Sequence, residues 1–420
     1  MPAVPRRTGA VLRMLVGLAW LAASGQTAAE CVPDSTHACL SNGRYRAEVV
    51  WREPRFAPDG ASGYVFPLTN ESAAFWFFAP GNLEVVCKVL DGRALNGRFW
   101  LFTAALTSVE FDLRVTDSVA GWRKSWFHSA SAPSSQADVG AFSEDPLPGS
   151  VMFLGAHPDD ETTAAPLLGR FCVELGQRCS LLVATRGESG QCRLPGGCLP
   201  DLASVRTREM QAAAALFGAA LTQWDLPDLP GPDPEAVRAA WAARSGGDEA
   251  LVMRIAGAIA ASAPQTVVTY DPQHGSTCHP AHRALGSLVL DALARLGGSA
   301  PATFLLETRV ERPENGEAVH FSPFVPEDSR AFAFDATLAR GGPARGTAWD
   351  FLIEDARAHP SQFTTSFLRS LSSVPDSDRE VRLLPRPDFG EDPRYAGLCA
   401  GDRPGAAGEE APDEADQVNP

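Results

Sequence analysis

From residue 151 onward, short apolar runs alternate with longer helix-forming stretches. Continuous apolar runs are typical of parallel strands that are buried on both faces. Strands are expected at residues 151–156, 180–185, within 221–229, at 265–270 and at 303–310. Helices are expected between them at residues 163–176, 202–220, 249–261 and 282–296. This alternation predicts an α/β fold with a Rossmann-like, mostly parallel sheet that helices cover on both faces.

Residues 31–142 have a different pattern, in which apolar and polar positions alternate. Strands are expected at residues 44–51, 83–90, 97–104 and 109–116. Turn-forming pairs such as Asp91-Gly92 and Asn96-Gly97 separate them. The pattern predicts an all-β, sandwich-like domain before the α/β domain. Its many aromatic residues fit a sandwich core, because alternation turns half of them inward, and a sugar-stacking platform is the alternative.

Composition predicts the domain boundaries. We expect a signal peptide at residues 1–29, the all-β domain at 30–142, a linker at 143–150, the α/β domain at 151–400 and a disordered acidic tail at 401–420. The signal peptide has a positively charged start at Arg6 and Arg7, then an apolar core, and ends in small residues near Ala29. A secreted or periplasmic bacterial protein is therefore expected, without a membrane span after cleavage. An uncleaved membrane anchor is the alternative.

Charge and cysteine content narrow the function. The formal net charge of −15 argues against a nucleic-acid partner, which usually needs a basic face. Nine cysteines fit export to an oxidising compartment. Three pairs are close enough in sequence for local disulfides: Cys31 with Cys39, Cys172 with Cys179, and Cys192 with Cys198. The odd count leaves a thiol over, and Cys87, inside an expected strand, is the candidate for a buried free thiol.

Histidine and carboxylate side chains follow two of the expected strands, at the edge where parallel sheets bind ligands. His157, Asp159 and Asp160 follow the first strand, and His279 and His282 follow a strand much later in the chain. A hydrolytic zinc site uses three protein ligands and one water. His157, Asp160 and one of the two later histidines supply such a set. Asp159 is the expected general base, and the remaining histidine would stabilise the oxyanion or protonate the leaving group.

The chemistry expected at this site is metal-assisted hydrolysis. The metal would lower the pKa of its bound water from about 15.7 to roughly 7, which makes this water a nucleophile at neutral pH. Histidine and carboxylate ligands suit Zn²⁺, and another divalent transition metal such as iron or cobalt is the alternative. His157 and Asp160 could instead cap the following helix, but the distant histidine pair favours the metal site.

Four motifs occur in order between residues 150 and 300. They are AHPDDE at 156–161, TRGESG at 185–190, RTRE at 206–209 and HPAH at 279–282. Together they resemble the PIG-L/LmbE-type zinc-dependent de-N-acetylases. The chain departs from the family pattern at Ala281, where the family usually has aspartate. HPSQ at 359–362 is similar to a later family segment to which we assign no role. Residues 39–51, 75–78, 83–92 and 95–102 resemble parts of an accessory β-module of secreted bacterial proteins, over about a hundred residues of this chain.

The resemblance implies roles for six residues: zinc binding by His157, Asp160 and His282, general base catalysis by Asp159, assistance to the tetrahedral intermediate by His279, and substrate contact by Arg206. It implies an LmbE-like metallohydrolase domain that hydrolyses the N-acetyl amide of an amino-sugar-containing glycan or glycolipid. The alternative is a secreted glycan-binding protein with a catalytically lapsed hydrolase domain. A nucleotide-dependent dehydrogenase is disfavoured, because no GxGxxG loop follows the first strand.

Overall fold

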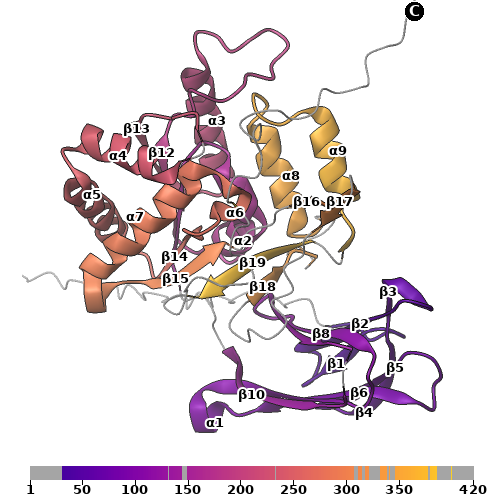
Figure 1. Ribbon diagram of the computed structural model, residues 1–420. Helices are drawn as coiled ribbons and strands as arrows, with labels where there is room; N and C mark the ends of the chain where they lie inside the picture. The colour runs from indigo at the N-terminus through magenta and orange to yellow at the C-terminus, as the bar shows by residue number, and fades with distance from the viewer. Residues whose placement is uncertain are drawn as a thin grey trace, which may run out of the picture.

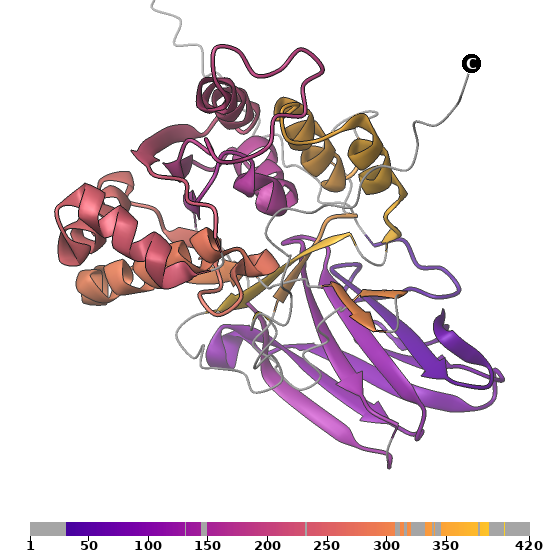
Figure 2. The same cartoon turned by 45° about the horizontal axis from the view of Figure 1, so that its top comes forward.

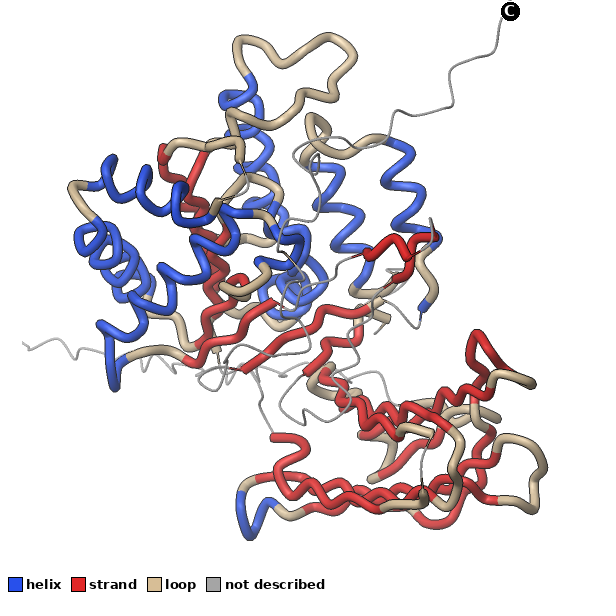
Figure 3. The backbone as a smooth tube through the Cα atoms, in the orientation of Figure 1, coloured by secondary structure: helices blue, strands red, loops and turns tan. Residues whose placement is uncertain are grey.

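The computed structural model describes most of the chain, namely residues 31–130, 132–143, 149–231, 233–306, 311–314, 317–320, 332–337, 340, 346–376, 379–385 and 399. The expected signal peptide and the expected acidic tail lie outside the described residues. An N-terminal β unit packs below a larger α/β unit in the view of Figure 1. The tube in Figure 3 shows that the helices gather almost entirely in the α/β unit.

The N-terminal unit is an antiparallel sandwich, as the alternation of its residues predicts. Its elements are β1 (Ala38–Leu40), β2 (Tyr45–Glu53), β3 (Ala57–Ser62), β4 (Tyr64–Thr69), β5 (Ser72–Trp76), β6 (Leu83–Asp91), α1 (Arg93–Asn96), β7 (Arg98–Ala105), β8 (Glu110–Asp117), β9 (Trp122–His128) and β10 (Ser135–Ser143). One layer has the order β10-β7-β6-β5-β4, and the other contains β1, β2, β8 and β9. Trp51, Phe75 and Phe111 are buried between the layers, which confirms the core interpretation for these aromatics.

The α/β unit is built on five parallel strands in the order β15-β14-β11-β12-β13. They are β11 (Val151–Gly155), β12 (Cys179–Thr185), β13 (Ala220–Leu226), β14 (Thr266–Tyr270) and β15 (Ala302–Leu306). Each lies at a run that the apolar pattern marks as a strand, and β11 and β14 are buried along their whole length. The predicted mostly parallel sheet is therefore confirmed.

Helices cover both faces of this sheet. One face carries η1 (Asp160–Ala164), α2 (Ala165–Leu168), η2 (Gly169–Glu174), α3 (Leu202–Leu216) and α8 (Trp349–Ala358), with α9 (Thr365–Ser373) beside α8. The other face carries α4 (Pro234–Ser245), α5 (Asp248–Ser262) and α7 (Pro280–Leu296), with α6 (Gly275–Cys278) and η3 (Gly297–Ser299) at the ends of α7. Figure 2 shows α4, α5 and α7, in red to orange, apart from the yellow α8 and α9.

The helix expected at residues 163–176 is irregular. It consists of the 3₁₀ turn η1, the short helix α2 and the π turn η2. Gly169 lies in this segment, at a position where a Cβ atom would lie 2.0 Å from the Phe351 ring of α8. The glycine allows α8 to pack closely against this segment, and π turns of this kind often occur at functional sites.

One continuous sheet joins the two units. Strands β18 (Phe332–Asp335) and β19 (Glu380–Pro385) connect β9 of the N-terminal unit to β15, giving a twelve-stranded sheet. Trp122 of β9 pairs with Phe334 of β18, and its ring belongs to the core of the α/β unit. A separate hairpin is formed by β16 (Glu311–Glu314) and β17 (Glu317–His320). The units thus share backbone pairing and part of one core.

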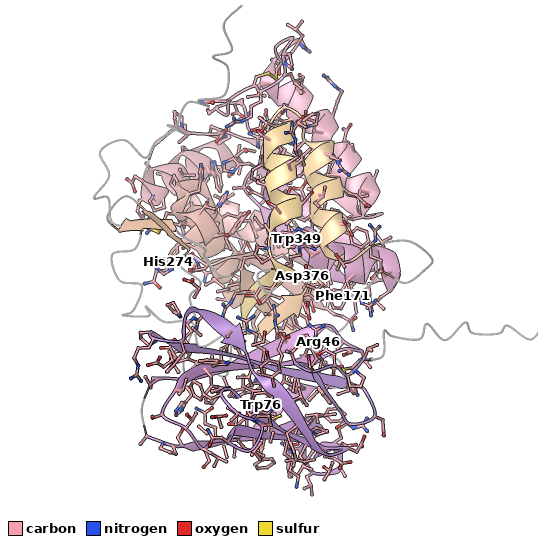
Figure 4. All side chains as sticks on the ribbon, turned by 90° about the vertical axis from the view of Figure 1, so that its right-hand side faces the viewer. Arg46, Trp76, Phe171, His274, Trp349 and Asp376 are labelled. Atoms are coloured by element: carbon pink, nitrogen blue, oxygen red, sulfur yellow. A yellow bond between two sulfur atoms is a disulfide. The ribbon has the colours of Figure 1, made fainter. Side chains whose placement is uncertain are left out.

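Buried ion pairs reinforce this junction. Arg46 of β2 pairs with Asp335, and Arg123 of β9 pairs with Glu380 of β19. Figure 4 shows Arg46 on the side of the N-terminal unit that faces the α/β unit. Arg123 is 2% exposed and Asp335 is fully buried. Removing one partner of such a buried pair typically costs about 3–5 kcal/mol, so these contacts couple the stability of the two units.

The structure contains the three local disulfides that the spacing suggests, and Cys87 is a buried free thiol. A fourth disulfide joins Cys278 to Cys399 across 121 residues of sequence. Among the residues that the structure describes, no helix has the length and apolar character needed to cross a membrane.

Candidate metal centre

The two polar motifs meet at the carboxyl edge of the parallel sheet. His157, Asp159 and Asp160 follow β11, and His279 and His282 lie at the start of α7, after the neighbouring strand β14. Because β11 and β14 are hydrogen-bonded neighbours, both motifs emerge at the same edge. The structure therefore brings together all six residues that the sequence singles out for the site. Five of them lie in the two motifs, and the sixth, Arg206, contacts Asp159 from α3.

Three donor atoms form a nearly equilateral triangle. His282 Nε2 lies 3.3 Å from His157 Nδ1 and 3.1 Å from Asp160 Oδ1. His157 Nδ1 lies 3.5 Å from Asp160 Oδ1. A tetrahedral zinc ion with bonds of about 2.0–2.1 Å separates its ligand atoms by roughly 3.3 Å. The donor types and spacing therefore fit one Zn²⁺ with a fourth position free.

Neighbouring groups orient each of the three metal-ligand atoms toward the centre of this triangle. His282 Nδ1 donates to Gly275 O at 2.9 Å, which leaves its Nε2 lone pair free. His157 Nε2 faces Asp228 Oδ1 at 3.3 Å, which leaves Nδ1 free in the same way. Asp160 Oδ2 accepts hydrogen bonds from the backbone N–H groups of Ala156 and His157, so that Oδ1 points to the histidines. Such partners fix ring orientation and raise ligand basicity in metal sites.

The charges of the protein groups favour a cation here. Burial lowers the pKa of His157, but the carboxylates of Asp160 and Asp228 outweigh it and raise this pKa to about 10. Burial also raises the pKa of Asp160, but His282 and His157 hold it well below its ordinary value. The protein groups by themselves therefore keep a proton between two carboxylates at neutral pH. A divalent cation would displace that proton, as metal binding to histidine generally does.

Asp159 lies beside the triangle in a strained conformation. Its φ of +112° falls in a region that residues other than glycine rarely adopt. Its side chain is 19% exposed and accepts a hydrogen bond from Arg206 Nη2 at 2.7 Å. Burial raises the pKa of Asp159 to about 6, with Arg206 opposing and Asp160 adding to the shift. The carboxylate is therefore ionised at neutral pH and is a stronger base than an ordinary aspartate.

His279 lies at the open side of the site and caps α7. Its Nδ1 accepts from the backbone N–H of Ala281, so the neutral ring carries its proton on Nε2. Burial and the neighbouring His157 and His282 lower the pKa of His279 to about 3. It is therefore a neutral hydrogen-bond donor. A set of His157, His279 and His282 could also hold a metal, but Nδ1 of His279 is engaged, and Asp160 completes the tighter triangle.

Arg206 is buried, whereas a residue that contacts substrate from a helix surface would be exposed. It is 4% exposed, and it donates to Gly187 O at 3.0 Å, to Pro158 O and to the Asp159 carboxylate. It thereby links α3 and the loop after β12 to the base. The predicted contact with substrate stays a prediction, since no structural contact tests it.

Gly187 leaves the space that Arg206 occupies, so Gly187→Ala tests this packing. Its φ is +67°, and a Cβ atom there would lie 2.3 Å from Arg206 Nη1. We expect a loss of about 1–2 kcal/mol in unfolding free energy from the left-handed backbone, and at least about a tenfold loss of activity from the displaced guanidinium. Urea unfolding and steady-state kinetics measure both. Gly197→Ala in the same loop has a similar φ of +74° and open space around it, and is the matched control. It should lose stability but keep activity, and an equal loss of activity there would contradict the packing argument.

Two groups of site residues have no clear signal in the sequence. Asp228 lies just after β13 and contacts His157, yet nothing around it marks it as different from other loop acids. Asp355 and His359 lie in and after α8 and contact the residues that follow Asp160. The similarity of the HPSQ segment to a family segment singles out His359 in the sequence, but it assigns no role to this residue.

Comparison with known proteins shows similarity to a described family over residues 152–293. Residues 152–293 match the family model described as GlcNAc-PI de-N-acetylase. A 1D-myo-inositol 2-acetamido-2-deoxy-α-D-glucopyranoside deacetylase from Kineococcus radiotolerans is 31% identical over 40% of this chain and 53% of its own. The chain spans about half the length of the curated relatives it matches.

Two solved structures are similar to part of this chain. The N,N'-diacetylchitobiose deacetylase from Pyrococcus horikoshii has a TM-score of 0.34 and 18% identity, over 53% of this chain and 74% of that one. The 4-carboxy-2-hydroxymuconate hydratase from Pseudomonas putida KT2440 has a TM-score of 0.39 and 17% identity, over 58% of this chain and 99% of that one. With the family match and the ordered motifs, residues 152–293 of this chain are a domain of the PIG-L/LmbE de-N-acetylase family.

Proposed function

We propose that this protein is a metal-dependent deacetylase that hydrolyses the N-acetyl amide of an amino-sugar-containing substrate. The observation that carries the proposal is the triangle of His157 Nδ1, Asp160 Oδ1 and His282 Nε2 beside the carboxylate of Asp159. The relative from Kineococcus radiotolerans is named for a substrate with an acetamido sugar. That name supports the substrate class for this chain.

His157, Asp160 and His282 would hold the metal, with Zn²⁺ as the first candidate. When bound, the cation supplies Lewis-acid activation of water and polarisation of the amide carbonyl. Asp159 takes a proton from the water that adds to the carbonyl carbon. His279 donates its Nε2–H to the oxyanion that develops on the carbonyl oxygen. The C–N bond then breaks, Asp159 returns the proton to the leaving nitrogen, and acetate and a free amine are released.

Arg206 keeps the Asp159 carboxylate in place during these proton transfers. Its hydrogen bond to Oδ1 and its bonds to two backbone carbonyls support this role, and they leave it little freedom to move. Fixed geometry of the base is a large part of the rate gain in such reactions, since a misplaced base must be reoriented at each turnover.

The proposal includes an extracytoplasmic location. Four disulfides and an N-terminal signal-like sequence both fit an oxidising compartment. The substrate would then be an envelope or extracellular glycan or glycolipid. The domain division at residues 143–150 belongs to the same proposal, with the hydrolase domain at 151–400 after the β domain.

Acetate release from a panel of N-acetylated sugars and glycans tests the function. The full-length protein is expressed with export, purified, and assayed with zinc, with a chelator and after zinc is restored. We expect acetate and a new primary amine in equal amounts, loss of both with chelator, and recovery with zinc. Substrate binding without acetate release, in protein that carries its metal, would instead indicate a glycan-binding protein with a lapsed site.

A further inference from the structure

A second buried polar cluster lies behind the metal centre. Glu161, Asp355 and His359 are all fully buried, and one ligand atom from each lies within 4.8 Å of the others. However, His359 Nε2 and Glu161 Oε1 are only 2.6 Å apart. This is a hydrogen-bond distance, and it is shorter than the roughly 3.3 Å between two ligands of one tetrahedral cation. The cluster is therefore a hydrogen-bonded pair with a neighbouring acid, not a second metal site.

The carboxylate of Glu161 connects His359 to Asp159. Its Oε1 faces His359 Nε2, and its Oε2 accepts the backbone N–H of Asp159 at 3.2 Å. That N–H belongs to the residue with the φ of +112°. A strained backbone conformation persists only where the surroundings over-determine it. The Glu161–His359 pair supplies such a restraint from a segment that is 198 residues away in sequence.

A second hydrogen bond ties the turn η1, which follows Asp159, to α8. Thr162 Oγ1 donates to Asp355 Oδ2 at 2.8 Å, and Asp355 lies on α8. Two consecutive residues of the loop, Glu161 and Thr162, are thus tied to residues 355 and 359. Phe351 and Ile353 of α8 lie in the hydrophobic core, so core packing anchors the helix that carries these ties.

The same segment also contacts the helix that carries Arg206, the other partner of Asp159. Ser361 donates from both its backbone N and its Oγ to the Glu209 carboxylate, at 2.9 Å and 2.5 Å. Glu209 is buried on α3, one turn after Arg206. Residues 355–361 therefore contact both the loop that carries the base and the helix that carries its arginine.

We propose that residues 355–361 position the catalytic base, with His359 as the main positioning residue. His359 acts through Glu161 to hold the backbone of Asp159 in its left-handed conformation, and Asp355 holds the same loop through Thr162. His359 does not touch the substrate or the metal. This inference assigns a function to the HPSQ segment, and it rests on the proposed deacetylase function for its kinetic readout.

Two conservative substitutions test the proposal. His359→Phe keeps an aromatic ring at this position and removes the hydrogen bond to Glu161, and Thr162→Val keeps the volume and removes the bond to Asp355. We expect kcat to fall about 10–100-fold in His359→Phe, the range seen when supporting residues of metal sites are removed. We expect a smaller fall in Thr162→Val, since one of the two ties remains. KM and zinc affinity should change less than about threefold in both, because a transition-state interaction is lost.

Two further variants separate positioning from general destabilisation. His359→Gln restores a donor near the Nε2 position and should recover most of the lost kcat. His128→Phe removes another buried histidine, in β9, whose Nε2 faces Thr107 O; it should lower the melting temperature without lowering kcat. Unchanged kcat in both His359→Phe and Thr162→Val, or a loss of kcat matched by an equal loss of zinc affinity, would overturn the proposal.

Crystal structures of the wild type and the variants make the inference independent of turnover. We expect Asp159 to leave its positive φ in His359→Phe and to keep it in His128→Phe. If the wild type releases no acetate from any substrate, the proposed function fails, but the conformation of Asp159 still decides the positioning role. If His359→Phe does not fold, His359→Asn, whose side chain is too short to reach Glu161, gives the same readout, and a wild-type conformation of Asp159 in that variant would overturn the inference.

Discussion

Replacing Asp159 with asparagine is expected to lower kcat for deacetylation by about 10²–10⁴-fold, the usual contribution of a general base. The amide keeps the shape of the carboxylate and still accepts a hydrogen bond from Arg206, but it cannot take a proton from water. Zinc content should stay near that of the wild type, because Asp159 is not one of the three ligands. Acetate release and metal analysis of the same preparation measure the two quantities.

Asp225→Asn is the matched control for this prediction. Asp225 lies on β13 with a side chain that is 71% exposed, so the substitution makes the same change in charge away from the triangle. Its kcat should equal that of the wild type. Near-normal acetate release by Asp159→Asn would assign the base to another group, and loss of zinc from this variant would assign Asp159 to the ligand set.

Replacing His282 with alanine is expected to abolish metal binding and activity together. The substitution removes the Nε2 donor, the hydrogen bond to Gly275 O and a ring that stacks on Tyr270 at 4.1 Å. We expect zinc affinity to fall by more than the roughly 10–100-fold that loss of a supporting residue causes. Isothermal titration with zinc, and melting curves with and without zinc, measure the loss.

The melting curves have a quantitative expectation. Zinc at 100 times its dissociation constant would stabilise the wild type by about 2.7 kcal/mol, and it should not stabilise His282→Ala. His279→Ala is the control, because His279 lies near the triangle without completing it; this variant should keep the zinc shift and lose activity. The reverse result, with zinc lost in His279→Ala, would support the set of three histidines instead.

The parallel sheet and the two metal motifs are predictable from the sequence because both are local signals. β11 is a continuous apolar run and β14 is rich in β-branched residues, and the polar residues that follow the two strands must lie at one edge if the strands are neighbours. Helix α4 also has local signals that the pattern of apolar residues does not reveal. Asp233 caps it through Glu235 N, and Pro234 opens it.

The supporting residues of the site are not predictable in this way. Asp228 is one acid among many until β13 is placed beside β12, and His359 meets Glu161 only through the packing of α8 on the irregular segment after Asp160. The positive φ of Asp159 is equally hidden, because aspartate at that position would be expected to adopt an ordinary backbone conformation. Such contacts depend on tertiary structure between residues that are far apart in the sequence, and local propensity says nothing about them.

The pairing that joins the two units into one sheet is also not predictable from the sequence. It depends on β18, which has only four residues. This strand lies between β9 of the N-terminal unit and β19 of the α/β unit. Without β9, one row of its backbone N–H and C=O groups would have no strand to pair with. Open strand edges of this kind pair readily with other chains and lead to aggregation. The N-terminal unit therefore protects the sheet of the α/β unit against intermolecular strand pairing.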